Sequence, residues 1–174
     1  MSKRFLLMCG VLVVALVSIA IAASPSDTKL GKCLPTSGDV SGWSVVSSTY
    51  KYGEGDGIAD IYNGGYEKYV DQGMEAACTQ NYKNGDRRIN VFCNQFSSSG
   101  KAKSFYDSQA TGSGWTTVSA TERAKYKKSS STVVGHIQRG RVHAKVVAPG
   151  TSDAQVEAVQ AFLKRISTRI GQNY

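Results

Sequence analysis

The stretch Tyr62-Asn-Gly-Gly-Tyr-Glu67-Lys-Tyr69 gathers phenol, amide and carboxylate side chains that could hold a polar ligand. If it is helical, Asn63 and Glu67 stand four residues apart and share one face. A carboxylate beside an amide and the phenols of Tyr62 and Tyr69 could then bind such a ligand. The alternative is structural: the paired glycines permit close packing, Asn63 caps a broken helix and the tyrosines fill the edge of the core. Tyr62, Asn63, Glu67 and Tyr69 are therefore candidate ligand-binding residues.

His136 and His143 form the second candidate site. A two-residue turn at Arg139-Gly140 would place the two imidazoles directly opposite each other on the polar face of a hairpin. Two ligands are too few for a catalytic zinc, which normally has three from the protein, and nearby cations disfavour a divalent metal, so we predict no metal. The alternatives are a basic surface that contacts anions and a sheet face that is solvated or covered by a helix.

Sequence signatures of enzymes are missing from the chain. The carboxylates between Glu54 and Asp60 lack the spacing of a calcium loop, and Gly112-Ser-Gly114 is not the G-x-S-x-G motif. There is no dinucleotide or phosphate-loop fingerprint. We therefore assign no catalytic residue and no cofactor, and favour a protein that is not an enzyme.

Residues 1–22 have the pattern of an export signal. Lys3 and Arg4 precede an unbroken apolar run that ends in Ala20-Ile-Ala22, a small-residue cleavage pattern. The run is long for a signal, so an uncleaved N-terminal anchor is the alternative. In both cases we expect the rest of the chain outside the cytoplasm, in the periplasm or secreted. That location argues against nucleic acid as a partner.

The remaining chain predicts a linker over residues 23–32 and a single α+β domain over 33–174. The whole chain has 21 Lys and Arg against 13 Asp and Glu, a formal charge of +8. A basic exported protein can meet an acidic envelope protein or an anionic envelope component, although charge that only keeps the domain soluble explains the same composition. The membrane is a predicted partner only if the leader is uncleaved.

Three cysteines follow the leader, and an oxidising compartment favours their pairing. In a hairpin whose loop is residues 84–87, Cys78 lies opposite Cys93. A tighter turn would place Ala76 opposite Cys93 instead. We predict a Cys78–Cys93 disulfide, with Cys33 as the competing partner or the free thiol.

Hydrophobic periodicity and turn residues predict the elements of the domain. They are a strand over 44–52, an interrupted helix over 58–70, strands over 74–82 and 88–96, a helix over 101–110, a short strand near 115–118, a hairpin over 132–147 and a helix over 153–170. Ser152 and Gln155 form a capping-box pattern for the last helix, and Gly171 is a suitable terminator. Strands joined mostly by hairpins predict an antiparallel sheet with helices packed on it.

The opening Cys33-Leu-Pro, the later Val40-Ser-Gly-Trp43 and the segment Asp60-Ile-Tyr-Asn-Gly-Gly-Tyr-Glu67-Lys-Tyr69 together resemble a bacterial exported family of unknown function. Its members carry a Gly-Trp start and a Tyr-Ile-Asn-Gly-(Gly/Ala)-x-Glu-x-Tyr segment. This chain departs from the family at Tyr62, where Ile is frequent, and in its cysteines. The resemblance implies a PsbP/Mog1-like fold and carries over no catalytic residue.

These observations predict an exported, non-enzymatic domain that binds an envelope partner or a small ligand. One alternative is an envelope enzyme whose groups converge only in the folded chain. The other is an assembly accessory that an uncleaved leader holds at the membrane.

Overall fold

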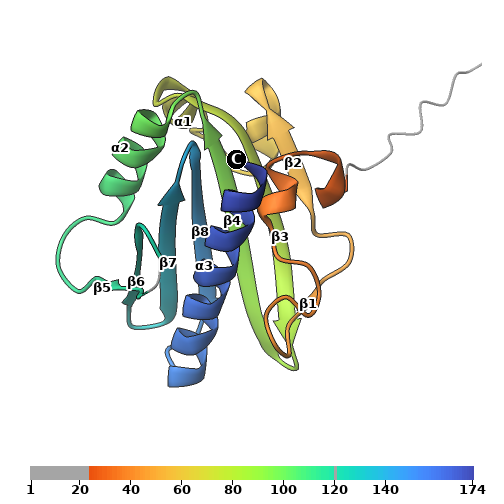
Figure 1. The fold of residues 1–174 in the computed structure, drawn as a ribbon, viewed down its shortest axis with the longest axis vertical. Coiled ribbons are helices and arrows are strands. Elements are labelled where there is room, and N and C mark those ends of the chain that lie inside the picture. The colour runs from red at the N-terminus through yellow and green to blue at the C-terminus, as the bar shows by residue number, and fades with distance from the viewer. Residues whose placement is uncertain (1–23, 120) are drawn as a thin grey trace, which may run out of the picture.

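The computed structural model describes residues 24–119 and 121–174. The predicted export signal, residues 1–22, lies outside them. The described chain forms an eight-stranded sheet with a helix packed on each face (Figure 1). Each strand pairing is antiparallel. The predicted α+β class with an antiparallel sheet is therefore confirmed. No helix among the described residues is both long enough and apolar enough to span a bilayer.

The strands pair in the order β1-β3-β4-β8-β7-β6-β5, and β2 also pairs with β3. The elements are, in chain order, η1 Pro25–Asp27, η2 Gly31–Cys33, β1 Ser44–Val45, β2 Lys51–Glu54, η3 Gly55–Asp60, α1 Glu67–Asp71, β3 Met74–Asn84, β4 Arg87–Phe96, α2 Ser99–Gln109, β5 Thr116–Thr117, β6 Ala124–Lys128, β7 Thr132–Arg139, β8 Val142–Pro149 and α3 Asp153–Asn173. Strand β6 was not predicted, because its side chains alternate between small or aromatic residues and lysines and give little apolar signal.

The β3–β4 hairpin has the predicted register, with Cys78 opposite Cys93. The predicted disulfide is nevertheless not formed: Cys33, Cys78 and Cys93 are all free and fully buried. Directly opposed Cβ atoms lie about 4.5–5.5 Å apart, and a disulfide needs about 3.8 Å, so the strands would have to move together. A hydrogen bond with Cys78, together with burial, raises the pKa of Cys93 far above its usual range, so this thiol stays protonated.

The β7–β8 hairpin corrects the second predicted register. Its turn is Gly140-Arg141, so Arg139 pairs with Val142 and His143 lies opposite Gln138, not opposite His136. Gly140 has φ +54, and a glycine at the first turn position is what a hairpin turn of this kind requires. The pairing is displaced by two residues from the prediction. Because side chains alternate with period two, every residue keeps its predicted face.

Helix α3 packs on one sheet face, which we call the α3 face. Ser152 caps it by accepting a hydrogen bond from the Gln155 backbone, as the sequence predicted. A Cβ on Gly135 would lie 2.7 Å from side-chain atoms of Val159 and Leu163, so the glycine lets α3 approach the sheet. The helix continues through the predicted terminator Gly171, where a Cβ would meet the Arg139 guanidinium at 2.5 Å. Gly171 therefore makes room for the Arg139 side chain against α3 and does not end the helix.

The N-terminal part of the chain is more closely integrated than the predicted linker over 23–32 suggests. Leu30 is only 2% exposed and belongs to the main core. The predicted strand over 44–52 is two short strands, β1 and β2, and the residues between them include Ser48 with φ +59. The predicted helix over 58–70 is split into η3 and α1, with Gly64 and Gly65 at positive φ between them.

Candidate functional site

The sheet face opposite α3, which we call the α2 face, carries the predicted site residues. One end of it is covered by η3, α1 and α2 through an apolar cluster. That cluster comprises Ile58, Met74, Ala77, Phe96, Ala102 and Phe105. The strand residues beyond these helices, at the other, open end, are mainly polar or basic. Side chains alternate between the two faces along each strand, so the residues on the α3 face form the main core and the polar side chains lie on the α2 face.

A chain of hydrogen bonds runs through the covered end. Tyr62 Oη donates to Asn94 Oδ1 at 2.8 Å, and Asn94 Nδ2 lies 3.2 Å from His143 Nδ1. His143 Nε2 lies 3.0 Å from His136 Nδ1. Since the amide nitrogen can only donate, His143 accepts at Nδ1 and donates from Nε2, and His136 accepts at Nδ1. We call Tyr62, Asn94, His143 and His136 the histidine chain.

Aromatic side chains close the histidine chain off from water. The Phe105 ring of α2 lies 5.0 Å from the His143 ring, and Trp115 lies 5.4 Å from His136, both edge-on. His143 is 1% exposed and His136 4%. Burial, followed by the charge of Lys145, lowers the pKa of His136 to about 4. Burial and the neighbouring His136 hold the pKa of His143 well below its usual range, so both imidazoles are neutral at pH 7.

The two predicted sites thus meet through Asn94, a residue that was not among the predicted site residues. Tyr69 packs against Tyr62, with 4.8 Å between ring centroids. Asn63 and Glu67 do not join this group, because both are exposed on the surface. The pattern of alternation could have placed Asn94 on the polar face of β4. Its contact with His143 depends on the pairing of β4 with β8, which no local pattern encodes.

The open end of the α2 face is hollowed along β3 and β4. Two hollows of about 360 and 270 Å³ both include Asn81 and Asn90 in their walls, and we call them together the Asn81 groove. The larger is lined by Ser48, Thr49, Lys51, Asp60, Ile61, Asn63, Thr79, Asn81, Asn90 and Phe92. The smaller adds Val46, Arg88, Ile89, Val147 and Pro149. Of the predicted site residues, Asn63 alone lines it.

An unsatisfied acceptor lies in the wall of this groove. Asn81 and Asn90 are cross-strand partners, and Asn90 Nδ2 donates to Asn81 Oδ1. Asn90 Oδ1 is closed off from solvent and has no hydrogen-bond partner among the described residues. Thr49 fixes the groove edge by accepting from the Asn81 backbone at 3.1 Å and donating to the Val46 carbonyl at 2.8 Å. A buried acceptor without a partner costs about 1–3 kcal/mol, but this atom is closed to a ligand as it is to water.

Lysines flank the buried His136 on both sides, where the covered end of the α2 face meets the open end. Lys125 of β6 and Lys145 of β8 both pair with His136 in register, and Lys127 lies two residues along β6 on the same face. We call Lys125, Lys127 and Lys145 the lysine strip. The strands of the sheet contain two acids, Glu54 and Glu75, and neither faces the strip: Glu54 is hydrogen-bonded by Tyr52, and Glu75 is paired with Arg141. None of the three lysines has an ion pair within the described part of the chain.

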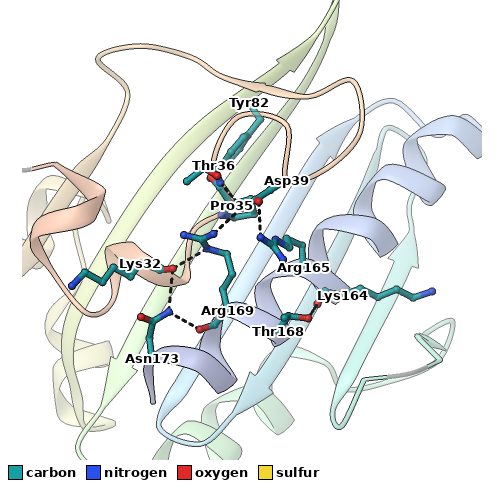
Figure 2. A network of polar contacts seen from close by, with 10 residues as sticks. All are labelled: Lys32, Pro35, Thr36, Asp39, Tyr82, Lys164, Arg165, Thr168, Arg169 and Asn173. Carbon is teal, nitrogen blue, oxygen red and sulfur yellow. Dashed lines mark hydrogen bonds and ion pairs between the residues drawn. The ribbon is translucent and has the colours of Figure 1, made fainter.

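A second charged cluster lies on the α3 side of the sheet and has a structural role (Figure 2). Asp39 accepts hydrogen bonds from Arg165 at 2.6 Å and Arg169 at 2.8 Å, and Arg169 also donates to the Lys32 carbonyl. Burial alone would raise the pKa of Asp39, but hydrogen bonds from Arg165 and Thr36 outweigh it and lower the pKa to about 2. The cluster fastens the N-terminal segment to α3.

Comparisons with known proteins identify no family for this chain. No family model matches it, and no curated protein matches it. Among solved structures it is similar to the extracellular domain of PknH from Mycobacterium tuberculosis, with 17% identity over 83% of this chain and 95% of that chain and a TM-score of 0.48. At that level of similarity, the assignment of function has to come from the α2 face itself.

Proposed function

We propose that this chain is an exported, non-enzymatic domain that binds an anionic component of the cell envelope on the open end of its α2 face. The observation that carries the proposal is the lysine strip: three lysines that form no ion pair among the described residues, on a face where the strands carry no acid. Lys127 also donates to the Ser113 carbonyl at 3.0 Å, which leaves Lys125 and Lys145 as the main anion contacts. The proposal of export rests on the leader pattern of residues 1–22. The resemblance to a PsbP/Mog1-like exported family stays a prediction alongside it.

The arrangement of the strip favours an anion. Lys125 and Lys145 are separated by one strand, which places their backbones about 10 Å apart. His136 between them is neutral at pH 7, so it adds no third positive charge, and Trp115 packs against its ring. Like charges at this distance repel by about 0.4 kcal/mol in water, and a phosphate or carboxylate group between them reverses that sign. A protein partner of acidic character and an acidic polymer both satisfy this chemistry.

A catalytic role has less support from the geometry. Each imidazole of the histidine chain accepts at Nδ1 from a neighbour, and His143 is engaged at both ring nitrogens. Neither ring reaches bulk solvent where a substrate could approach. A general base needs a free nitrogen within reach of the proton that it removes, so the histidine chain is better suited to fixing β4, β7 and β8 beneath α2.

The test compares two matched double variants of the exported protein. K125Q/K145Q removes two charges from the strip, and K29Q/K164Q removes two exposed charges elsewhere. The probe is long-chain polyphosphate, with affinity measured by isothermal titration calorimetry at several salt concentrations. We expect K125Q/K145Q to weaken binding about 10-fold or more, since two contacts of about 0.7 kcal/mol each give that factor, and K29Q/K164Q to change it less than about 2-fold. Equal losses in the two variants would show that net charge, not the strip, attracts the anion.

A further inference from the structure

The Asn81 groove adjoins the lysine strip where Phe92 pairs with Lys145. Phe92, at the end of the larger hollow, is the register partner of Lys145, and Asn90 is the partner of Val147. A register row crosses six strands from Lys125 on β6 through Lys145, Phe92 and Thr79 to Lys51 on β2. Its five interstrand steps span about 24 Å. That length suits a chain-like ligand rather than a single small anion.

We propose that the anionic component is an acidic polysaccharide, whose hydroxyl groups occupy the Asn81 groove while its carboxylates or phosphates lie on the lysine strip. This inference rests on the proposed function and specifies its ligand. The groove offers uncharged amide and hydroxyl groups from Ser48, Thr49, Asn63, Asn81 and Asn90. Its charged lining residues are of both signs: Lys51, Arg88 and Asp60. The uncharged groups recognise hydroxyls through paired hydrogen bonds, and they contribute no charge to hold an anion by themselves.

Two exposed acceptors at the rim of the groove separate a polysaccharide from other polyanions. The Asp60 carboxylate and the Asn63 amide oxygen can both accept a hydrogen bond, and neither side chain has a partner among the described residues. Ionised phosphates and carboxylates are acceptors only, whereas a sugar hydroxyl both donates and accepts. Tyr62 stacks on the Phe92 ring with 5.8 Å between ring centroids, so Val147 beside the groove supplies the apolar surface that suits the carbon-bound face of a sugar ring. A polyanion that carries no hydroxyl groups would not occupy this groove.

Neither of the two other macromolecular partners fits this face as well. A membrane-binding face carries exposed apolar side chains that enter the lipid. The exposed large hydrophobic residues of the described chain are Val70, in α1, and Tyr174, at the C-terminus, and neither lines the groove. An extended acidic peptide would add to a free sheet edge. The groove instead lies on a face, above the paired strands β3 and β4.

The test titrates the exported protein with polygalacturonate, with polyglutamate of matched length, with neutral dextran and with vesicles containing phosphatidylglycerol. Polygalacturonate and polyglutamate both carry regularly spaced carboxylates, but polygalacturonate alone carries hydroxyls. We expect polygalacturonate to bind at least about 10-fold tighter than polyglutamate, which corresponds to about 1.4 kcal/mol. Dextran and vesicles should bind more weakly than either.

Variants assign that preference to the groove. N90L removes an amide from the groove wall. N63A removes an exposed amide at the rim whose side chain makes no hydrogen bond among the described residues, so this variant should fold. Both should reduce the preference for polygalacturonate while leaving polyglutamate affinity within about 2-fold, whereas K125Q/K145Q should weaken both polymers. Equal binding of the two polymers to the unmodified protein, with K125Q/K145Q still deleterious, would overturn the polysaccharide and keep the proposed function. Preferential binding to vesicles would also overturn it, and no binding of any anion would overturn both proposals.

Discussion

The buried histidine chain predicts a loss of stability between pH 7 and pH 5. His136 has a pKa of about 4 in the folded protein against 6.5 as its ordinary value. The unfolded chain therefore binds more protons in this window, and acidification favours unfolding. For His136 alone the free energy of unfolding falls by about 2 kcal/mol from pH 7 to pH 5, and by about 3 kcal/mol below pH 4. His143 acts in the same direction.

The assay is urea unfolding followed by circular dichroism at several pH values. Asp39, with its pKa of about 2, stays ionised throughout this window, so it does not obscure the effect. The matched variant is H136Q/H143Q, whose amides can hydrogen-bond but do not titrate. We expect its unfolding free energy to change by less than about 1 kcal/mol over the same range. An unmodified protein whose stability is flat between pH 7 and pH 5 would refute the neutral buried pair.

Three further predictions concern packing and charge on the α3 side. D39N should lower the free energy of unfolding by about 1–2 kcal/mol after allowance for solvent screening, whereas D107N, in a surface ion pair, should lower it by less than about 0.5 kcal/mol. The destabilisation by D39N should fade as the pH drops from 3.8 towards 2. A D39N protein as stable in urea as D107N would contradict the structural role of the charged cluster around Asp39. G135A should lower the free energy of unfolding by about 1–3 kcal/mol through overpacking. G57A, where a Cβ meets open space, should lower it far less. Equal melting temperatures of the two variants would contradict the close approach of α3 to the sheet. Thiol titration of the chain after its leader should count three free thiols in denaturant and none under native conditions, and a single thiol in denaturant would restore the predicted disulfide.

The sequence predicted the face of each hairpin residue better than the turn that joins the strands. In both hairpins the glycine, Gly85 or Gly140, stands first in a two-residue turn. Reading Arg139-Gly140 as the turn placed His136 opposite His143 instead of diagonal to it. The predicted apolar and polar faces are nevertheless correct, because a displacement of two residues preserves side-chain alternation. For the same reason His136 and His143 still lie on one face and are in contact.

The site that Tyr62, Asn94 and the two histidines form together could not be predicted from local sequence patterns. Asn94 joins Tyr62 to the histidines only because β4 pairs with β8, a contact between distant parts of the chain. The lysine strip depends on β6, whose alternation of lysines with Ala124 and Tyr126 lacks the apolar run that identifies a strand. The helix from Ser152, by contrast, carries its cap and its apolar stripe locally, and it was predicted almost to its end.

The most direct test of the central claim is the mapping of ligand contacts by nuclear magnetic resonance. Amide shifts of the isotopically labelled exported protein would be followed during titration with polygalacturonate. The account predicts changes concentrated at Lys125, Lys145, Asn81 and Asn90, on the open end of the α2 face, with α3 unaffected. Changes concentrated on α3 and around Asp39, or spread evenly over the exposed lysines, would contradict it.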